Sequence, residues 1–351
     1  MSNQSPPLRV GVIGLGMMGQ THLDAYAKMP GVKVTAVADL DEDRLSGKST
    51  AGGNIEGQAQ GGFDLGSPEV RKVRNGIDLI VASDLDIIDV CVPTPGHLSI
   101  GLAALRAGKH TLIEKPLART YTQAQQLADA AEQAWAEHRA VSMCAMCMRF
   151  WPGWDWLKEA VDQQTYGKAH AVTFRRVAQF PGGPFYSNGE ASGGAILDLH
   201  IHDTDYVRYL FGEPQRVVTN GYAKTTGQPD HVLTTYQFPA DTVGLTDDAF
   251  VCAEGGWVMA EGFGFSMRYT VNFENATADF DLARGDKPLL LHQAGQTVEI
   301  ELPGGMGYDR ELEYFVDCVR RGEQAYRVTL RDAALSVQLI ETELKALQAP
   351  G

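Results

Sequence analysis

The feature that most constrains the fold is the run GVIGLGMMG at residues 11–19, which follows an apolar strand pattern and precedes a helical one. It holds Gly14, Gly16 and Gly19 in the G-x-G-x-x-G spacing. The first glycine permits a tight turn, the second lets the backbone approach a pyrophosphate, and the third allows the helix to pack closely on the strand. By itself the spacing is a weak signal, because the chain contains 38 glycines.

An acidic residue strengthens the interpretation. Asp39 ends the next predicted strand, KVTAVAD, 20 residues after Gly19. A carboxylate at that position accepts hydrogen bonds from the hydroxyls of an adenosine ribose. It would repel a 2′-phosphate, so the pattern favours NAD over NADP, although Arg44 nearby keeps NADP as the alternative. The predicted cofactor contacts of this segment are Gly14, Gly16, Met17, Met18, Gly19 and Asp39.

The order of patterns predicts an α/β protein with two domains. Strand patterns at 8–14, 33–39, 87–93 and 110–114 alternate with helical ones, which is typical of a parallel sheet. From residue 169 strand follows strand, with a helix expected around 197–210 and two helical segments, 308–322 and 329–347, at the end. We predict an N-terminal Rossmann dinucleotide-binding domain over 1–122. A C-terminal α/β domain with an open, mostly antiparallel sheet is expected over 123–351, and the last helices could pack back on the first domain.

Composition narrows the functional classes. A chain of 351 residues with 44% hydrophobic residues exceeds what one core usually serves. The net charge of −14 comes without a basic patch and disfavours nucleic acid and anionic membranes as partners. The first ten residues do not resemble a secretory signal, and no apolar run approaches the roughly 20 residues of a membrane span. With five scattered cysteines, these features predict a cytoplasmic protein with reduced thiols.

The run DLHIHDTD at 198–205 is dense in side chains that bind metals or move protons. On a continuous helix, Asp198 and His202 project from one face because they are four residues apart, whereas His200 points elsewhere. Asp205 lies near the face of Asp198 and is the one candidate for a third metal ligand. A proton relay of Asp198 and His202 is the favoured interpretation, and a metal site is the minor alternative.

Three segments in this order, the glycine fingerprint, IEKP at 113–116 and GGAILDLHIHDTDYVRYLFG at 193–212, resemble the glucose-fructose oxidoreductase, inositol dehydrogenase and MocA family. The resemblance implies a Rossmann domain followed by an open sheet that often forms an oligomer interface, hence a homodimer or homotetramer. It implies NAD(P)-dependent chemistry on a secondary hydroxyl of a sugar, inositol or related polyol. The implied catalytic residues are Lys115, Asp198 and His202, without a metal. Further cofactor contacts are implied for Pro93, Thr94, His97, Glu114 and Lys115.

Oxidation of a secondary alcohol requires a base at the hydroxyl while the cofactor accepts the hydride. Histidine titrates near neutral pH, so we expect His202 to be the acid/base, with Asp198 orienting its ring. Lys115 would stabilise the developing alkoxide. Substrate contacts are expected from Lys115, Arg176, Tyr186, Asp198 and His202.

Two other functions remain open. A family variant can use NAD transiently in glycoside cleavage, and a nucleotide-sensing regulator can share the fold without catalysis. The glycine-rich stretch 46–66 is expected to be a loop, either an inserted surface loop or a flap beside the adenosine.

Overall fold

The computed structural model describes residues 6–48, 62–81 and 84–348. The chain divides into two compact units, residues 1–147 with 308–335 and residues 148–307 with 336–351. No helix within these described stretches is long and apolar enough to cross a membrane. Most of the glycine-rich stretch, residues 49–61, lies outside the described residues, so the prediction of a flap or surface loop there stays open.

The first unit is built on a parallel sheet of six strands with the order β3-β2-β1-β4-β5-β6. Its strands are β1 (Leu8–Ile13), β2 (Val32–Ala38), β3 (Arg71–Val73), β4 (Ile87–Val90), β5 (His110–Glu114) and β6 (Ser142–Ala145). The order in which strands are added to the sheet reverses between β1 and β4, since β2 and β3 lie on one side of this point and β5 and β6 on the other. Ligands of such sheets bind at this point, outside the carboxyl ends of the strands. The predicted parallel Rossmann sheet is therefore confirmed.

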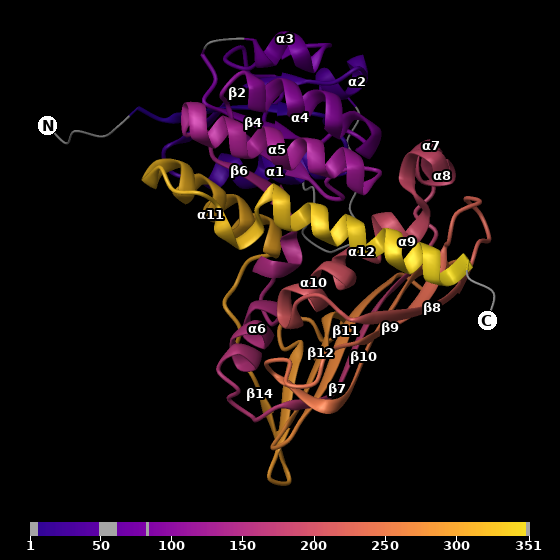
Figure 1. Ribbon diagram of the computed structural model, residues 1–351. Coiled ribbons are helices and arrows are strands. Elements are labelled where there is room, and N and C mark those ends of the chain that lie inside the picture. The colour runs from indigo at the N-terminus through magenta and orange to yellow at the C-terminus, as the bar shows by residue number, and fades with distance from the viewer. Residues whose placement is uncertain (1–5, 49–61, 82–83, 349–351) are drawn as a thin grey trace, which may run out of the picture. The chain divides into compact units, whose positions relative to one another are not determined.

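Helices flank this sheet (Figure 1). They are α1 (Met17–Lys28), α2 (Glu42–Leu45), α3 (Gly76–Ile80), α4 (His97–Arg106), α5 (Tyr121–His138) and α11 (Gly307–Arg321). Helix α5 begins at a Thr120 cap whose hydroxyl accepts from Gln123 N, and it ends at Arg139 in the left-handed region with φ of 56°. The sheet extends through β6, beyond residue 122, and α11 groups with this unit. A boundary at 122 therefore does not coincide with the edge of the sheet.

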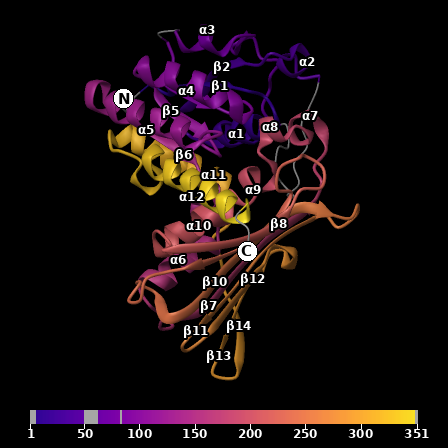
Figure 2. The same ribbon diagram turned by 45° about the vertical axis from the view of Figure 1, so that its right-hand side comes forward.

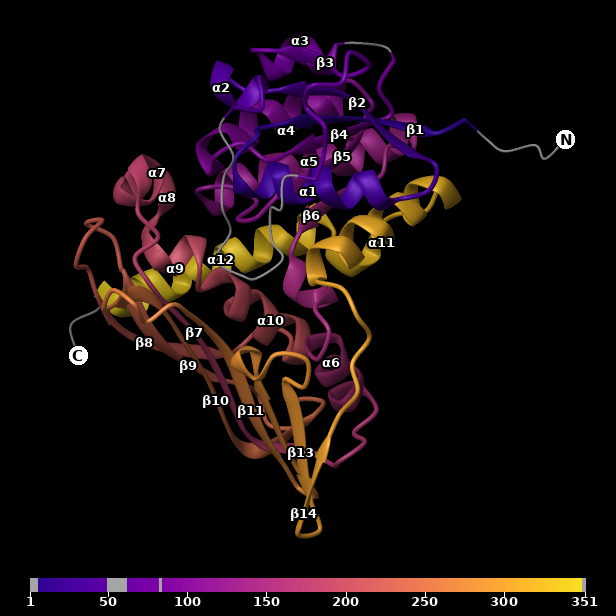
Figure 3. The same cartoon turned by 180° about the vertical axis from the view of Figure 1, so that it is seen from behind.

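The second unit contains a sheet of eight strands with the order β14-β13-β12-β11-β7-β10-β9-β8. Only the β7–β10 pair is parallel among the pairs of this sheet, so the predicted mostly antiparallel sheet is confirmed. Its strands are β7 (Ala169–Gln179), β8 (Arg216–Tyr222), β9 (His231–Gln237), β10 (Leu245–Met259), β11 (Phe265–Phe273), β12 (Thr277–Asp281), β13 (Leu289–Gln293) and β14 (Gln296–Glu299). The β13–β14 hairpin forms one extremity of the sheet (Figure 3).

Helices cover one face of this sheet (Figure 2). They are α6 (Trp154–Asp162), α9 (Gly194–Asp198) and α10 (Ile201–Phe211), followed late in the chain by the part of α12 (Leu330–Gln348) from Ser336 onward, with α7 (Gly183–Ser187) and α8 (Gly189–Ser192) as short connections. Trp154 is fully buried at the centre of the core. Its ring lies 5.3 Å from that of Phe174 and 4.8 Å from that of Tyr206. Such aromatic contacts bury large apolar areas and fix α6 and α10 on the sheet.

The prediction of one helix over 197–210 is wrong in detail. Helix α9 ends at Asp198, and α10 begins at Ile201. Between them the N–H groups of Leu199 and His200 both bind the carbonyl of Ala195, which closes α9 before the chain turns into α10. Asp198 and His202 therefore do not lie on one face of a single helix, and their four-residue spacing does not show that their side chains meet.

Candidate NAD and substrate site

The glycine loop after β1 has the geometry that the fingerprint requires. Gly14 has a φ of +98°, and a Cβ there would lie 2.5 Å from the carbonyl oxygen of Cys91. A Cβ on Gly19 would lie 1.9 Å from the oxygen of Gly14, so helix and strand approach too closely for any side chain. A Cβ on Gly16 would meet no atom of residues 6–48, 62–81 or 84–348 within 4 Å, which leaves space beside these residues at the N-terminus of α1. This loop therefore fits a dinucleotide pyrophosphate.

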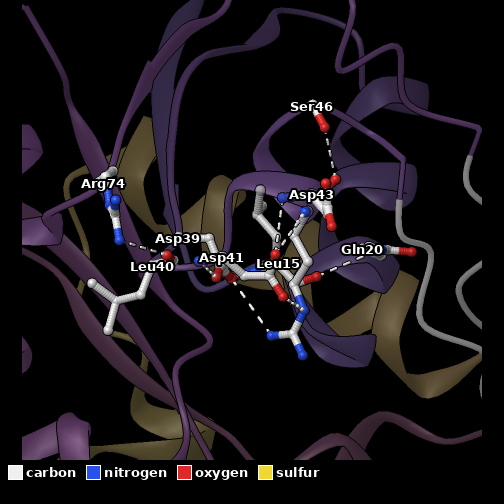
Figure 4. Close-up of polar contacts among 9 residues, drawn as sticks. Leu15, Gln20, Asp39, Leu40, Asp41, Asp43, Ser46 and Arg74 are labelled. Atoms are coloured by element: carbon white, nitrogen blue, oxygen red, sulfur yellow. Dashed lines mark hydrogen bonds and ion pairs between the residues drawn. The ribbon is translucent and has the colours of Figure 1, made fainter.

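Asp39 follows β2 and lies beside this loop (Figure 4). Its Oδ2 accepts a 2.6 Å hydrogen bond from Leu15 N, and its Oδ1 accepts one of 2.8 Å from Asp41 N. Arg44 Nη1 lies 3.8 Å from the same Oδ2. The carboxylate is thus held at the position predicted for the ribose contact, and Arg44 also lies 3.7 Å from Asp41 Oδ2 through its Nε.

The loop after β4 also reaches the carboxyl edge of the parallel sheet. Pro93 precedes a 3-10 turn over Thr94–Gly96, and Thr94 is buried. His97 is 1% exposed, with Nδ1 2.9 Å from the oxygen of Pro116 and Nε2 2.8 Å from the oxygen of Val92. Burial lowers the pKa of His97 despite these carbonyl contacts. The ring links two backbone segments, so its nitrogens are not available for the direct cofactor contact that we expected.

Lys115 follows β5 directly and is half-buried, and the Lys115–Pro116 peptide bond is cis. Because β1, β4 and β5 are parallel, the glycine loop, Thr94 and Lys115 all lie at the same edge of this sheet. This edge is where open α/β sheets bind their ligands. The glycine loop, Thr94 and Lys115 are thus the predicted cofactor contacts that this edge brings together.

Glu114 differs from the expectation, because its carboxylate turns into the protein. It is 5% exposed, its Oε1 lies 3.2 Å from His22 Nε2, and its Oε2 accepts a 3.0 Å hydrogen bond from Lys115 N. His22 Nδ1 in turn lies 2.8 Å from Asp89 Oδ2. The carboxylate of Glu114 therefore acts on the protein backbone and is not directed at a cofactor.

The sequence did not predict the buried contacts of Glu114 and Asp89 with His22, or the burial of Glu311. His22 looked like an ordinary residue of an amphipathic helix. Asp89 offered a signal, since it interrupts the apolar strand run IIDV, and an acidic residue in a buried strand is rare without a partner. Nothing in the local pattern of α11 distinguishes Glu311, which is also fully buried.

In the second unit, Asp198 at the end of α9 and His202 in the first turn of α10 are both half-buried. Leu197, His200, Ile201 and Asp203 around them are buried, whereas Leu199 is half-buried as they are. His200 is fully buried, with Nε2 3.2 Å from Glu343 Oε2, so this ring belongs to the packed interior of the unit.

Asp205 is not a third metal ligand. It is 1% exposed, its Oδ2 accepts from Arg149 Nε at 2.8 Å, and its Oδ1 accepts from Ser336 at 2.7 Å. The carboxylate is therefore committed to a buried ion pair. The same contacts give Arg149 a structural role in this buried ion pair.

The predicted substrate contact of Arg176 is not supported. Arg176 is 2% exposed, its Nε and Nη2 donate to the two carboxylate oxygens of Asp203 at 3.1 and 3.0 Å, and its Cζ lies 5.2 Å from the ring centroid of Trp154. A bidentate pair over an aromatic ring occupies the guanidinium fully. Tyr186 remains accessible on α7, half-buried, with its ring 5.8 Å from that of Trp257.

Comparison with known proteins agrees with this architecture. Residues 8–136 match the model of an oxidoreductase family with an NAD-binding Rossmann fold, and residues 154–279 match the C-terminal domain of the same family. The chain belongs to the GFO/IDH/MocA family of oxidoreductases. The expected fold, family and NAD-binding domain are therefore confirmed.

Individual relatives are distant but extend over most of the chain. The chain is 25% identical to inositol 2-dehydrogenase 2 of Paenarthrobacter aurescens, over 98% of this chain and 97% of that protein. It is 26% identical to myo-inositol 2-dehydrogenase of Thermotoga maritima over 80% of each chain. A solved levoglucosan dehydrogenase in complex with NADH and levoglucosan superposes with a TM-score of 0.80 at 20% identity, covering 97% of both chains. This last likeness concerns the fold.

Proposed function

We propose that this protein is an NAD-dependent dehydrogenase that oxidises a secondary hydroxyl of a cyclitol or sugar, or reduces the corresponding ketone. The observation that carries the proposal is the edge of the parallel sheet, where the fitted glycine loop, Asp39 and Lys115 lie after β1, β2 and β5. Relatives named inositol 2-dehydrogenase and levoglucosan dehydrogenase support polyols as the substrate class.

The proposed residues divide the chemistry of hydroxyl oxidation among them. Bound NAD supplies the hydride acceptor. His202 accepts the hydroxyl proton, because an imidazole titrates near working pH, and positioned bases of this kind contribute ~10² to 10⁴ in rate. Lys115 stabilises negative charge on the reacting oxygen. Asp198 binds a substrate hydroxyl or the imidazolium. This role rests on the family resemblance, because Asp198 and His202 lie on two different helices.

The test is a His202→Ala variant compared with His170→Ala, which removes an exposed imidazole from β7. We expect His202→Ala to lose turnover by roughly 10²-fold or more while NADH binding stays within about twofold. The His170→Ala variant should behave as the wild type. Equal losses of NADH affinity and turnover in His202→Ala would move this residue to the cofactor site.

Pairing of two chains through the open face of the eight-stranded sheet is also proposed. This face carries Val218, Leu233 and Phe250, which are 39%, 44% and 51% exposed. Strand register places them on one face, since Asn220 pairs with Leu233 and Leu233 with Glu254. Light scattering should give a multiple of the chain mass, and Leu233→Arg should lower it. A monomer in the unmodified protein would contradict this assembly.

A cytoplasmic location is proposed as well, supported by the five cysteines, all of which are buried thiols. Among the alternative functions, transient use of NAD in glycoside cleavage predicts products from glycosides without net NADH. Sensing predicts NADH binding without turnover. A substrate panel read at the NADH absorbance, with product analysis of glycosides, distinguishes the three.

A further inference from the structure

A cluster of ionisable side chains is buried within the first unit. It consists of His22 on α1, Asp89 on β4, Glu114 at the end of β5 and Glu311 on α11, and we call these four residues the buried cluster. Three of them have no exposed surface, and Glu114 is 5% exposed. No role in hydride transfer has been given to His22, Asp89 or Glu311.

His22 joins two of the carboxylates. Its Nδ1 lies 2.8 Å from Asp89 Oδ2 and its Nε2 lies 3.2 Å from Glu114 Oε1. Both contacts suit an imidazolium, which carries a proton on each nitrogen. Burial lowers the pKa of His22, but its contacts with Cys91 and Asp89 raise it by more, and this net upward shift favours the imidazolium.

Glu311 creates an imbalance of charge. Ligand atoms of His22, Glu114 and Glu311 lie within 4.8 Å of one another, and neither carboxylate oxygen of Glu311 has a hydrogen-bond partner among the residues that the structure describes. With all four groups ionised, three negative charges would face one positive charge without access to water. Buried charge without compensation is strongly unfavourable, so the site must take up a proton or a cation.

We propose that Glu311 carries a proton in the folded protein and that, with the His22 imidazolium, it fixes the Glu114 carboxylate against the backbone N–H of Lys115. The final contact is the 3.0 Å hydrogen bond from Lys115 N to Glu114 Oε2. His22, Glu114 and Glu311 are thus positioning residues for the end of β5. The Lys115 part of the inference rests on the proposed function, whereas the protonation of Glu311 does not.

The electrostatic surroundings of Glu311 agree with this state. Burial raises its pKa well above the ordinary value, and the Glu114 carboxylate raises it further, against the opposing effect of His22. The groups that face it are His22 and Tyr26 from α1, Asp89 from β4 and Glu114 from β5. A neutral acid can also donate its proton to Glu114, which no ionised carboxylate can do.

The protonation is tested with Glu311→Gln, whose amide is neutral and nearly the same shape. The matched control is Glu313→Gln, two positions along on the exposed side of α11. A carboxyl whose pKa is raised on folding stabilises the protein below its unfolded pKa and loses this contribution as the pH rises. The unfolding constant of the wild type, relative to Glu311→Gln, should therefore increase by up to about tenfold per pH unit above about pH 5. Glu313→Gln should show no such trend.

Two further measurements separate a proton from a cation. Difference infrared spectra should contain a protonated-carboxyl band that Glu311→Gln removes and Glu313→Gln retains. Elemental analysis of the purified protein should find no stoichiometric divalent metal. A stoichiometric metal that Glu311→Gln abolishes, or the absence of the infrared band, would overturn the protonated state.

The positioning role is tested by turnover of the best substrate from the polyol panel. Glu311→Ala should lower kcat by at least about tenfold with NADH affinity unchanged, because displacements near 1 Å can cost ~10² in rate. Glu311→Gln should restore kcat. If Lys115→Met lowers kcat and Glu311→Ala does not, the positioning role fails and the proposed function stands. If Lys115→Met has no effect, the proposed role of Lys115 fails, and the infrared result still decides protonation.

Discussion

Replacement of Asp39 by alanine should change the cofactor preference of the protein. The carboxylate accepts from Leu15 N at 2.6 Å and from Asp41 N at 2.8 Å, so it is already oriented before a ribose arrives. Preorganised acceptors lose little entropy on binding. The Asp39→Ala variant removes the ribose contact and also one restraint on the glycine loop.

The magnitude follows from the charge of the acceptor. A hydrogen bond to a charged group contributes roughly 1.5–3 kcal/mol, which corresponds to about 10- to 150-fold in affinity for NADH. NADPH should lose less or gain, because the variant removes a charge that repels its 2′-phosphate. It also releases Arg44, whose Nη1 lies 3.8 Å from Asp39 Oδ2. The ratio of the two affinities should therefore fall by at least about tenfold.

Titration of NADH and NADPH fluorescence on the purified protein measures both dissociation constants. Asp43→Ala is the control, because it removes an exposed carboxylate four residues further on. That variant should leave the ratio unchanged. An unchanged ratio in Asp39→Ala would refute the assignment of this carboxylate to the ribose.

Three other outcomes concern buried groups. Arg176→Ala should lower the free energy of unfolding, measured by urea titration, by roughly 3–5 kcal/mol, because it leaves Asp203 buried without its partner. A change in the KM for substrate with no loss of stability would instead place Arg176 at the substrate site. Burial raises the pKa of Asp230, but hydrogen bonds from the N–H groups of 224–226 lower it by more. Asp230→Asn should therefore be less stable than the wild type at pH 7, and the difference in stability between the two proteins should narrow below about pH 4. A difference in melting temperature that stays constant with pH would contradict this. Burial raises the pKa of the Cys91 thiol, so iodoacetamide should label this thiol at pH 8 only after the protein is unfolded. Rapid labelling of Cys91 in the native protein would contradict this prediction.

Much of the fold could be predicted from the spacing of hydrophobic residues and from the glycine and proline residues that end helices and strands. The glycine fingerprint, the strand runs and Asp39 predicted the parallel sheet, because each is a local pattern with a mechanical cause. The three-residue strand β3 was missed, since it is too short to show a period. Likewise, the predicted helix over 197–210 failed because the turn at Leu199 and His200 contains no glycine or proline to mark it.

The site was predicted less completely than the fold. Lys115 and the glycine loop lie at strand ends, where the parallel sheet alone predicts ligands. The partners of Arg176 and Glu114 could not be predicted, because Asp203 and His22 are brought to them by tertiary packing. Glu311 lies nearly 200 residues from Glu114 in sequence, and no local pattern joins such distant positions. Charged residues thus revealed their roles only when their partners were known.

The most direct measurement is turnover of NAD with myo-inositol, scyllo-inositol and levoglucosan, followed at the NADH absorbance for the wild type, Lys115→Met and His202→Ala. We predict NADH formation with at least one of these polyols, at a rate that each variant lowers by roughly 10²-fold or more while still binding NADH. No NADH from the wild type with any of the three, despite tight NADH binding, would contradict a polyol dehydrogenase. Full activity in both variants would contradict the assigned catalytic residues.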